Sequence, residues 1–135
     1  MSDIPSILRE ADVIAVVGLS GRPQRTSHQI AKNLQQAGYR IIPVNPNYDE
    51  VLGEPAVASL QDLPDESVDI INVFRAPEHT AGVVRDAIEY AGRTSRTPVI
   101  WTQLGVSSPE AESLAKDANL PYIRNRCIAV ELAKI

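Results

Sequence analysis

Residues 14–34, with the sequence IAVVGLSGRPQRTSHQIAKNL, constrain the fold more than any other stretch of the chain. The unbroken apolar run at their start is typical of a central parallel strand that is covered on both faces. Gly18 ends this run, a loop of glycine, serine, arginine and proline follows, and a helix with Thr26 as the expected N-cap comes next. A strand, a glycine-rich loop and a helix in this order form the layout of a nucleotide-binding element.

The start of that helix is suited to an anion. Gln29 stands three residues after Thr26, which is the spacing of a capping box. The backbone N–H groups of the first turn and the positive end of the helix dipole favour a phosphate, and Arg22 and Arg25 add positive charge. The glycine spacing, G-x-S-G, matches neither the dinucleotide-binding motif nor the P-loop. The stretch could therefore also be a plain connection between two elements of an α/β fold.

The rest of the chain alternates between helical and extended patterns. Apolar residues at Ile4, Ile7, Leu8 and Ala11 predict a short first helix, and further helices are expected from Pro77 to Gly92 and after Ser108. Strands are expected over residues 39–44, 68–74, 98–102 and 120–123, with a short third strand near 56–58 and a helix or coil after residue 124. Such alternation indicates parallel strands joined by crossover helices. We therefore predict an α/β fold: a single Rossmann-like doubly wound domain over residues 1–135, with a mostly parallel sheet and helices on both faces.

The ligand of such a sheet lies outside the carboxyl ends of the strands, where the strand order reverses. Residues 18–27, 44–47 and 73–77 should meet there. An NAD-binding unit usually has a carboxylate at the end of its second strand to bind the ribose hydroxyls, and an arginine there favours NADP. This chain has Asn45, and its next carboxylate is Asp49. Both cofactors are therefore disfavoured, and a nucleotide held through its diphosphate and adenine is the remaining option.

Composition narrows the function further. A length of 135 residues suits one domain with one core, and 44% hydrophobic and 22% charged residues are ordinary globular values. A net charge of −4 argues against general nucleic-acid binding, which needs a basic face. No apolar stretch is long enough to span a bilayer and the amino terminus does not resemble a signal peptide, so we expect a cytoplasmic protein. The single cysteine excludes an internal disulfide, and because no group of His, Cys, Asp and Glu has metal-ligand spacing, no metal is predicted.

Five blocks spread over nearly the whole chain resemble a known family: VGLSGRPQRTSH, GYRIIPVNP, VDIINVFR, VIWTQLGV and NRCIAVE. In order and spacing they are similar to the small stand-alone CoA-binding-domain proteins, relatives of the nucleotide-binding domain of the succinyl-CoA synthetase alpha subunit. The resemblance implies that coenzyme A is the cofactor. It also implies that the CoA diphosphate is cradled by Gly18, Leu19, Ser20, Arg22, Arg25, Thr26 and Ser27. Asn45 and Pro46 would border the adenosine, and Val73, Phe74 and Arg75 would line the opposite wall. Asn47 departs from the family, whose members often have a basic residue at this point.

Residues with catalytic potential are isolated in the sequence. His28 has no evident carboxylate to orient it, so we expect a structural role for it. Arg75 could hold a phosphate or pair with a surface carboxylate. Trp101 and Phe74 belong to apolar strands and are expected in the core. Cys127 follows Arg126, which could lower the pKa of its thiol, but a small buried apolar residue is the simpler expectation.

We therefore expect a protein that binds CoA or an acyl-CoA without catalysis, as a carrier, a sensor or a regulatory module. Three alternatives stay open: an NAD(P)-dependent oxidoreductase, a nucleotide-binding domain of another kind, and a protein-interaction domain that has kept the fold and lost the ligand. No nucleic-acid or membrane partner is expected, and the protein is expected to be a monomer or a small homo-oligomer. If Cys127 faces the crevice, the thiol of CoA could form a mixed disulfide with it under oxidising conditions.

Overall fold

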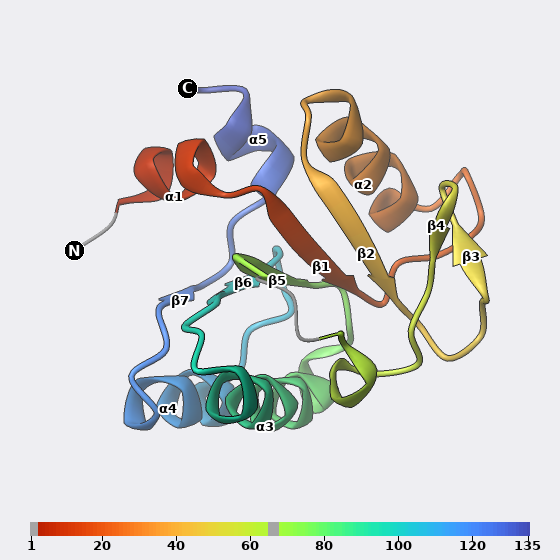
Figure 1. Cartoon of the computed structure of the whole chain (residues 1–135). Coiled ribbons are helices and arrows are strands. Elements are labelled where there is room, and N and C mark those ends of the chain that lie inside the picture. The colour runs from red at the N-terminus through yellow and green to blue at the C-terminus, as the bar shows by residue number, and fades with distance from the viewer. Residues whose placement is uncertain (1–2, 65–67) are drawn as a thin grey trace.

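The structure, a computed structural model, describes residues 3–64 and 68–135. Among these residues, five parallel strands form one sheet in the order β2-β1-β5-β6-β7. The strands are β1 (Val13–Val17), β2 (Arg40–Val44), β5 (Ile70–Val73), β6 (Val99–Thr102) and β7 (Tyr122–Ile123). One face of the sheet carries α1 (Ile4–Glu10), α2 (Thr26–Gln36) and α5 (Ile128–Leu132), and the other carries α3 (Pro77–Thr94) and α4 (Pro109–Asp117) (Figure 1). The predicted fold class is confirmed.

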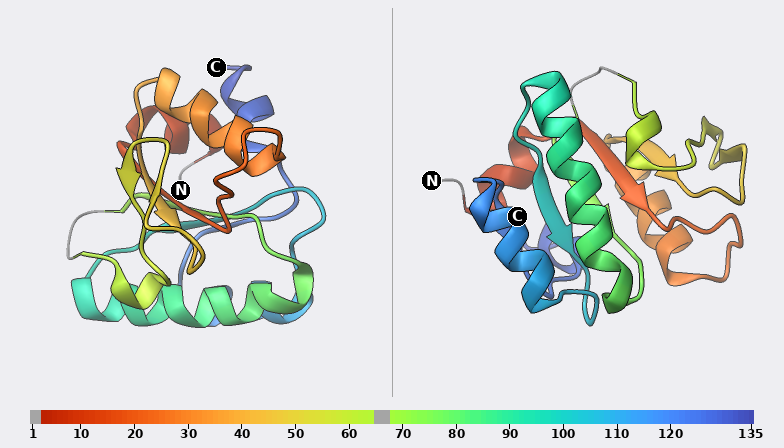
Figure 2. Two further views of the ribbon diagram at one scale, coloured as in Figure 1. Left: turned by 90° about the vertical axis from the view of Figure 1, so that its right-hand side faces the viewer. Right: turned by 90° about the horizontal axis from the view of Figure 1, so that it is seen from below.

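The sheet separates two apolar layers of side chains. The left view of Figure 2 shows the sheet between the helices of its two faces. Strand β1 lies at the centre, and its residues Ile14, Ala15 and Val16 are fully buried, as the unbroken apolar run predicts. Trp101 on β6 is also fully buried, and its indole N–H donates to the carbonyl oxygen of Arg126 at 2.8 Å. The prediction that Trp101 belongs to the core is therefore confirmed.

The strand order reverses beside β1. The chain places β2 on one side of β1 and then crosses to the other side to form β5. Val17 pairs in register with Val44 and with Val73, so the residues that follow these three strands emerge at one level. Backbone hydrogen bonds from Gly18 to Val44 and from Phe74 to Val17, both 2.8 Å long, extend this register past the strand ends. The carboxyl ends of β1, β2 and β5 therefore meet where a ligand of this fold lies.

The third strand predicted near residues 56–58 is wrong. The segment instead contains the hairpin of β3 (Glu50–Val51) and β4 (Glu54–Pro55), followed by the 3₁₀ helix η1 (Leu60–Asp62). Val57 alone pairs with β2, through one parallel bridge to Val44. The pairing stops because the Ser59 hydroxyl accepts a hydrogen bond from the N–H of Gln61 at 3.2 Å and turns the chain into η1.

The sequence predicted the start of α4 correctly but not the end of α3. Ser108 caps α4 as predicted, because its hydroxyl accepts from the N–H of Ala111 at 3.1 Å. The prediction that Gly92 ends α3 is wrong, since the helix runs to Thr94 and ends at Ser95, which has a left-handed φ of 57°. Tyr39 lies just outside β2, and its hydroxyl donates to the carbonyl oxygen of Leu8, which ties α1 to the sheet. Burial raises the pKa of this tyrosine.

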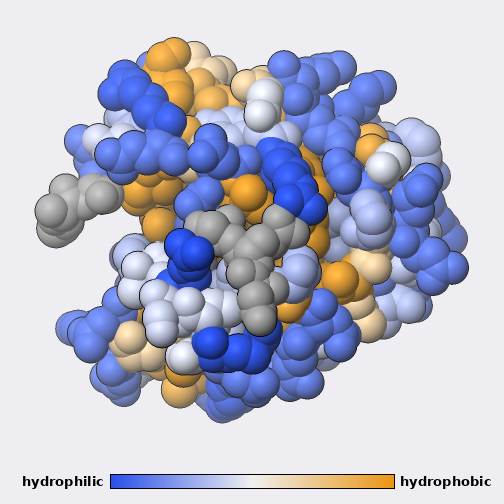
Figure 3. Space-filling model, in the orientation of Figure 1, coloured by the Kyte–Doolittle hydropathy of each residue, from blue (hydrophilic) through white to orange (hydrophobic). Residues whose placement is uncertain are grey.

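The molecular surface in Figure 3 is mainly hydrophilic, with apolar side chains showing over α5 at its top. Large exposed apolar residues of the described chain include Leu104, Val130 and Ile135. Within residues 3–64 and 68–135, no helix is long and apolar enough to cross a membrane.

Candidate nucleotide-binding site

A crevice of about 490 Å³ lies at the carboxyl ends of β1 and β2. Most of the predicted binding residues line it, namely Gly18, Ser20, Arg22, Arg25, Thr26, Ser27, Asn45 and Phe74, together with Asn47 and Tyr48. They come from the three segments that the sheet topology was expected to bring together. The structure therefore places the glycine-rich loop, the end of β2 and the end of β5 around one space.

Gly18 is required at the base of this crevice for two reasons. Its φ of +86° lies in the region that side chains with a Cβ rarely adopt. A Cβ at this position would also stand 2.4 Å from the carbonyl oxygen of Phe74 and 3.1 Å from Cδ of Arg75. The chain can therefore leave β1 close to the end of β5 only with glycine at this point.

Hydrogen bonds hold the loop after Gly18 against α2. The N–H of Ser20 donates to the Ser27 hydroxyl at 3.0 Å, and the Ser20 hydroxyl accepts from the N–H of Arg22 at 3.1 Å. Nδ1 of His28 lies 2.9 Å from the carbonyl oxygen of Ser20, which gives this histidine the structural role expected of it. The loop is thus fixed before any ligand arrives.

The capping box predicted for α2 is wrong. Thr26 is the first residue of the helix, Arg25 is the N-cap, and in the described part of the chain no side chain caps this end. The Gln29 amide instead faces the loop, at 3.4 Å from the carbonyl oxygen of Gln24. Because the helix already begins at Thr26, this residue does not occupy the N-cap position from which a hydroxyl accepts a first-turn N–H. The first-turn N–H groups are consequently left to other acceptors.

Positive charge at the crevice is not neutralised. Neither Arg22 nor Arg25 forms an ion pair with any carboxylate of the described residues, and both are exposed. A hydrogen bond from the Ser20 hydroxyl, a backbone hydrogen bond from Gly21 and the two arginine charges lower the pKa of the Tyr48 phenol. The crevice therefore stabilises negative charge, including that of a phenolate.

Asn45 at the end of β2 has both ends of its amide engaged. Its Nδ2 donates to the carbonyl oxygen of Leu19 at 3.0 Å, and its Oδ1 accepts from the N–H of Asn47 at 3.0 Å. These bonds join the end of β2 to the glycine-rich loop. Asn45 therefore shapes the crevice and supplies no carboxylate to it.

Several predicted site residues lie elsewhere. Leu19 and Val73 are fully buried, so their side chains cannot contact a ligand. Val73 packs in the layer below α3 and α4, whereas Leu19 packs in the layer below α1, α2 and α5, because the left-handed φ of Gly18 turns the chain after β1. Pro46 and Arg75 line a small neighbouring cavity of about 80 Å³, although Cδ of Arg75 also approaches Gly18.

A second space, the side cavity, has a volume of about 330 Å³ and lies next to the crevice. Its lining consists of Thr26, Ile30, Phe74, Arg75, Gln103, Leu104, Val106 and Cys127. The expectation that Phe74 belongs to the core is wrong in part, because its ring is half-buried and borders both spaces. Cys127 is also partly exposed rather than buried. The terminal segment explains both, because it folds back as α5 beside α2 and leaves a gap between them.

Sequence reasoning missed Tyr48 as a site residue. Its ring lies so close to Gly21 that a Cβ there would stand 2.5 Å from Cε1 of Tyr48. The only signal in the sequence was Gly21, which lies in the loop opposite the turn that contains Asn47. The contact between this loop and this turn depends on the register of β1 and β2, and the register cannot be read from the sequence.

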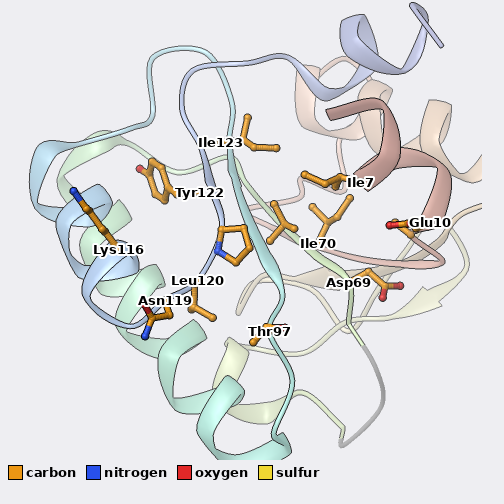
Figure 4. Close-up of a pocket in the computed structure, with 13 residues that line it drawn as sticks. Ile7, Glu10, Asp69, Ile70, Thr97, Lys116, Asn119, Leu120, Tyr122 and Ile123 are labelled. Atoms are coloured by element: carbon orange, nitrogen blue, oxygen red, sulfur yellow. The ribbon is translucent and has the colours of Figure 1, made fainter. Parts of the chain in front are cut away.

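A larger hollow of about 710 Å³ lies at the amino ends of β5 and β6, beside α1, α4 and β7 (Figure 4). Its floor is apolar, with Ile7, Ile70 and Ile123, and its rim has Glu10 and Asp69 on one side and Lys116 on the other. Asp69 is already engaged, since its Oδ2 accepts from the N–H groups of Asp12 and Val13 at 2.8 and 3.0 Å. This chemistry does not suit a phosphate.

Among the described residues, no group of three or more His, Cys, Asp and Glu side chains could hold a metal ion.

The fold and the crevice together define a Rossmann-like nucleotide-binding fold. The chain belongs to the CoA binding domain family, which matches residues 12–133. It is 45% identical over 129 residues to the uncharacterized protein YneT of Bacillus subtilis, covering 96% of this chain and 91% of that protein. It is 29% identical to acetate–CoA ligase [ADP-forming] I of Archaeoglobus fulgidus over 84% of this chain, which spans 16% of that ligase.

Solved structures share this fold. A hypothetical protein from Pyrococcus horikoshii OT3 is similar with a TM-score of 0.90 and 34% identity, covering 98% of this chain and 89% of the other. A protein from Thermus thermophilus is similar with a TM-score of 0.89 and 37% identity, covering 99% and 98% of the two chains. The family resemblance of the five sequence blocks is therefore confirmed.

Proposed function

We propose that this chain binds coenzyme A or an acyl-CoA in the crevice and performs no catalysis there. The observation that carries the proposal is an uncapped start of α2 next to Arg22 and Arg25, neither of which pairs with a described carboxylate. Free N–H groups and unpaired guanidinium groups are the donors that bind a diphosphate. Membership of the CoA binding domain family and similarity to a part of an ADP-forming acetate–CoA ligase support CoA as the nucleotide.

The end of β2 supports CoA over NAD. A dinucleotide-binding unit needs a carboxylate at this point for the ribose hydroxyls. Asn45 stands there, and its amide is engaged with Leu19 and Asn47. An oxidoreductase that uses NAD or NADP is therefore the weaker alternative.

The absence of catalysis is proposed from the arrangement of the titratable residues. A transfer site needs an acid, a base or a nucleophile oriented beside the reacting group. His28 is engaged with Ser20, and His79 is exposed near the start of α3. We propose that the protein acts as a carrier, a sensor or a regulatory module for its ligand in the cytoplasm.

Calorimetric titration with CoA and NAD tests the ligand. We expect binding of CoA in the micromolar range and much weaker binding of NAD. Mass spectrometry of the protein purified under native conditions should detect a co-purifying CoA species. Equal affinities for CoA and NAD would overturn the proposal.

Incubation with acyl-CoA thioesters, and with NAD(P)H plus carbonyl compounds, tests the absence of catalysis and should give no turnover. Turnover that is lost in His28→Ala would refute the non-catalytic role.

A further inference from the structure

The side cavity adjoins the crevice. Thr26 and Phe74 line both spaces, so a molecule that binds its phosphates at the start of α2 can extend past these two side chains. The two spaces differ in chemistry. Arginines, serines and asparagines surround the crevice, whereas Ile30, Leu104 and Val106 form apolar walls in the side cavity. An amphipathic ligand could place its charged end in the crevice and its apolar end in the side cavity.

One polar group in the side cavity has no partner. Gln103 is only 6% exposed, and its Oε1 accepts hydrogen bonds from the N–H of Ile128 at 2.9 Å and from Nδ2 of Asn72 at 3.1 Å. Because a backbone N–H can only donate, the bond to Ile128 determines which end of the amide is oxygen. Nε2 therefore lies on the opposite side, and no acceptor among the described residues bonds to it. Nε2 is not fully enclosed by the protein, and because Gln103 lines the side cavity, this amide can donate a hydrogen bond to a ligand carbonyl there.

From these observations we infer that the preferred ligand is a short-chain acyl-CoA rather than free CoA. The side cavity receives the thioester end, the apolar walls contact the acyl chain, and Gln103 Nε2 donates to the thioester carbonyl oxygen. This inference rests on the proposed binding of CoA in the crevice. It adds the class of ligand, because free CoA lacks both the acyl chain and the thioester carbonyl.

The size of the side cavity limits the chain. About 330 Å³ must hold the end of the pantetheine arm as well as the acyl group. Leu104 at the border of the cavity is 68% exposed, so a longer chain passes into water there. Each buried methylene should raise the affinity about fourfold. We expect affinity to rise from CoA to acetyl-CoA to butyryl-CoA and to stay level for longer saturated chains.

Calorimetric titration of the whole protein with CoA, acetyl-CoA, butyryl-CoA and octanoyl-CoA tests this inference. If CoA binds and all thioesters match it within twofold, the acyl-CoA inference fails while the proposed function stands. If neither CoA nor any thioester binds, both fail. A steady rise in affinity through octanoyl-CoA would overturn the short-chain limit.

Three variants locate the effect. Gln103→Glu keeps the oxygen that accepts from Ile128 and removes the donor, so it should abolish the preference for thioesters over CoA. Val106→Trp fills the side cavity from its rim and should also abolish the preference for thioesters. This second variant keeps the inference testable if Gln103→Glu does not fold. Val130→Ser, which replaces an exposed apolar residue outside the cavity, should preserve the preference. Retention of the full preference in both Gln103→Glu and Val106→Trp would overturn the assignment to this cavity.

Discussion

The crevice and the amino-end hollow lie at opposite ends of the same sheet, and they differ in size and in chemistry. The hollow is larger, at about 710 Å³ against 490 Å³, and its floor is apolar. The carboxylate of Asp69 in the hollow already accepts hydrogen bonds from the N–H groups of Asp12 and Val13. The crevice is smaller, but its helix end is uncapped and Arg22 and Arg25 pair with no described carboxylate. These unsatisfied donors are the reason that we propose the smaller space as the phosphate site.

The largest expected effect on binding comes from removing the crevice charges together. The double variant Arg22→Ala/Arg25→Ala should lose about 3–6 kcal/mol of CoA binding, or 100-fold or more in affinity, since each charge-assisted contact contributes about 1.5–3 kcal/mol. Calorimetry measures the change. Lys116→Ala in the amino-end hollow is the control and should leave CoA affinity unchanged. If Lys116→Ala weakened CoA binding and the double variant did not, CoA would bind in the amino-end hollow and not in the crevice.

The floor of the amino-end hollow should matter for stability instead. Ile70 is fully buried, so Ile70→Ala should lower the free energy of unfolding by about 2–5 kcal/mol through lost burial and a residual cavity. Urea unfolding monitored by circular dichroism gives this value. CoA affinity of the folded variant should be unchanged within twofold. A large loss of affinity with little loss of stability would mean that the hollow binds the ligand.

Arg75 lines the side cavity, and its Cδ approaches Gly18 at the base of the crevice, so its removal should have an intermediate effect. Arg75→Ala should weaken CoA binding by about tenfold, the contribution of one charge-assisted hydrogen bond. Arg85→Ala is the matched control, because Arg85 pairs with Glu110 at 3.4 Å on the exposed surface of α3 and α4. Equal affinities of the two variants would indicate that Arg75 has no contact with the ligand.

The smallest expected effect concerns pH. The pKa of Tyr48 is lowered in the free protein, chiefly by the hydrogen bond from Ser20. Ligand phosphates disfavour the phenolate, so CoA should raise this pKa again, and by linkage CoA affinity should fall as pH rises through the pKa of the free protein. The change should be a few-fold because the phenol is open to solvent. Tyrosinate absorbance and calorimetry at several pH values measure it, with Tyr48→Phe as the control that loses the dependence.

Local patterns were enough for much of the fold. The unbroken apolar run of β1 predicts a strand buried on both faces, and Ser108 predicts the start of α4, because both depend on neighbours in the sequence. The third strand near residues 56–58 failed for the opposite reason. Whether these residues pair with the edge of β2 depends on the tertiary structure, and only Val57 forms a bridge to it, through Val44.

The sequence by itself determined the class of site: an apolar strand, a glycine-rich loop, a helix start with nearby arginines, and no carboxylate after the second strand. These features are local, and the sheet topology that follows from alternating strands and helices brings them together. The tertiary structure alone decided which side chains reach the ligand space. Leu19 turns into the core and Tyr48 reaches across to Gly21 because the register of β1 and β2 sets the two loops against each other. The side cavity likewise exists only because the terminal segment returns to α2, a contact between residues distant in the chain.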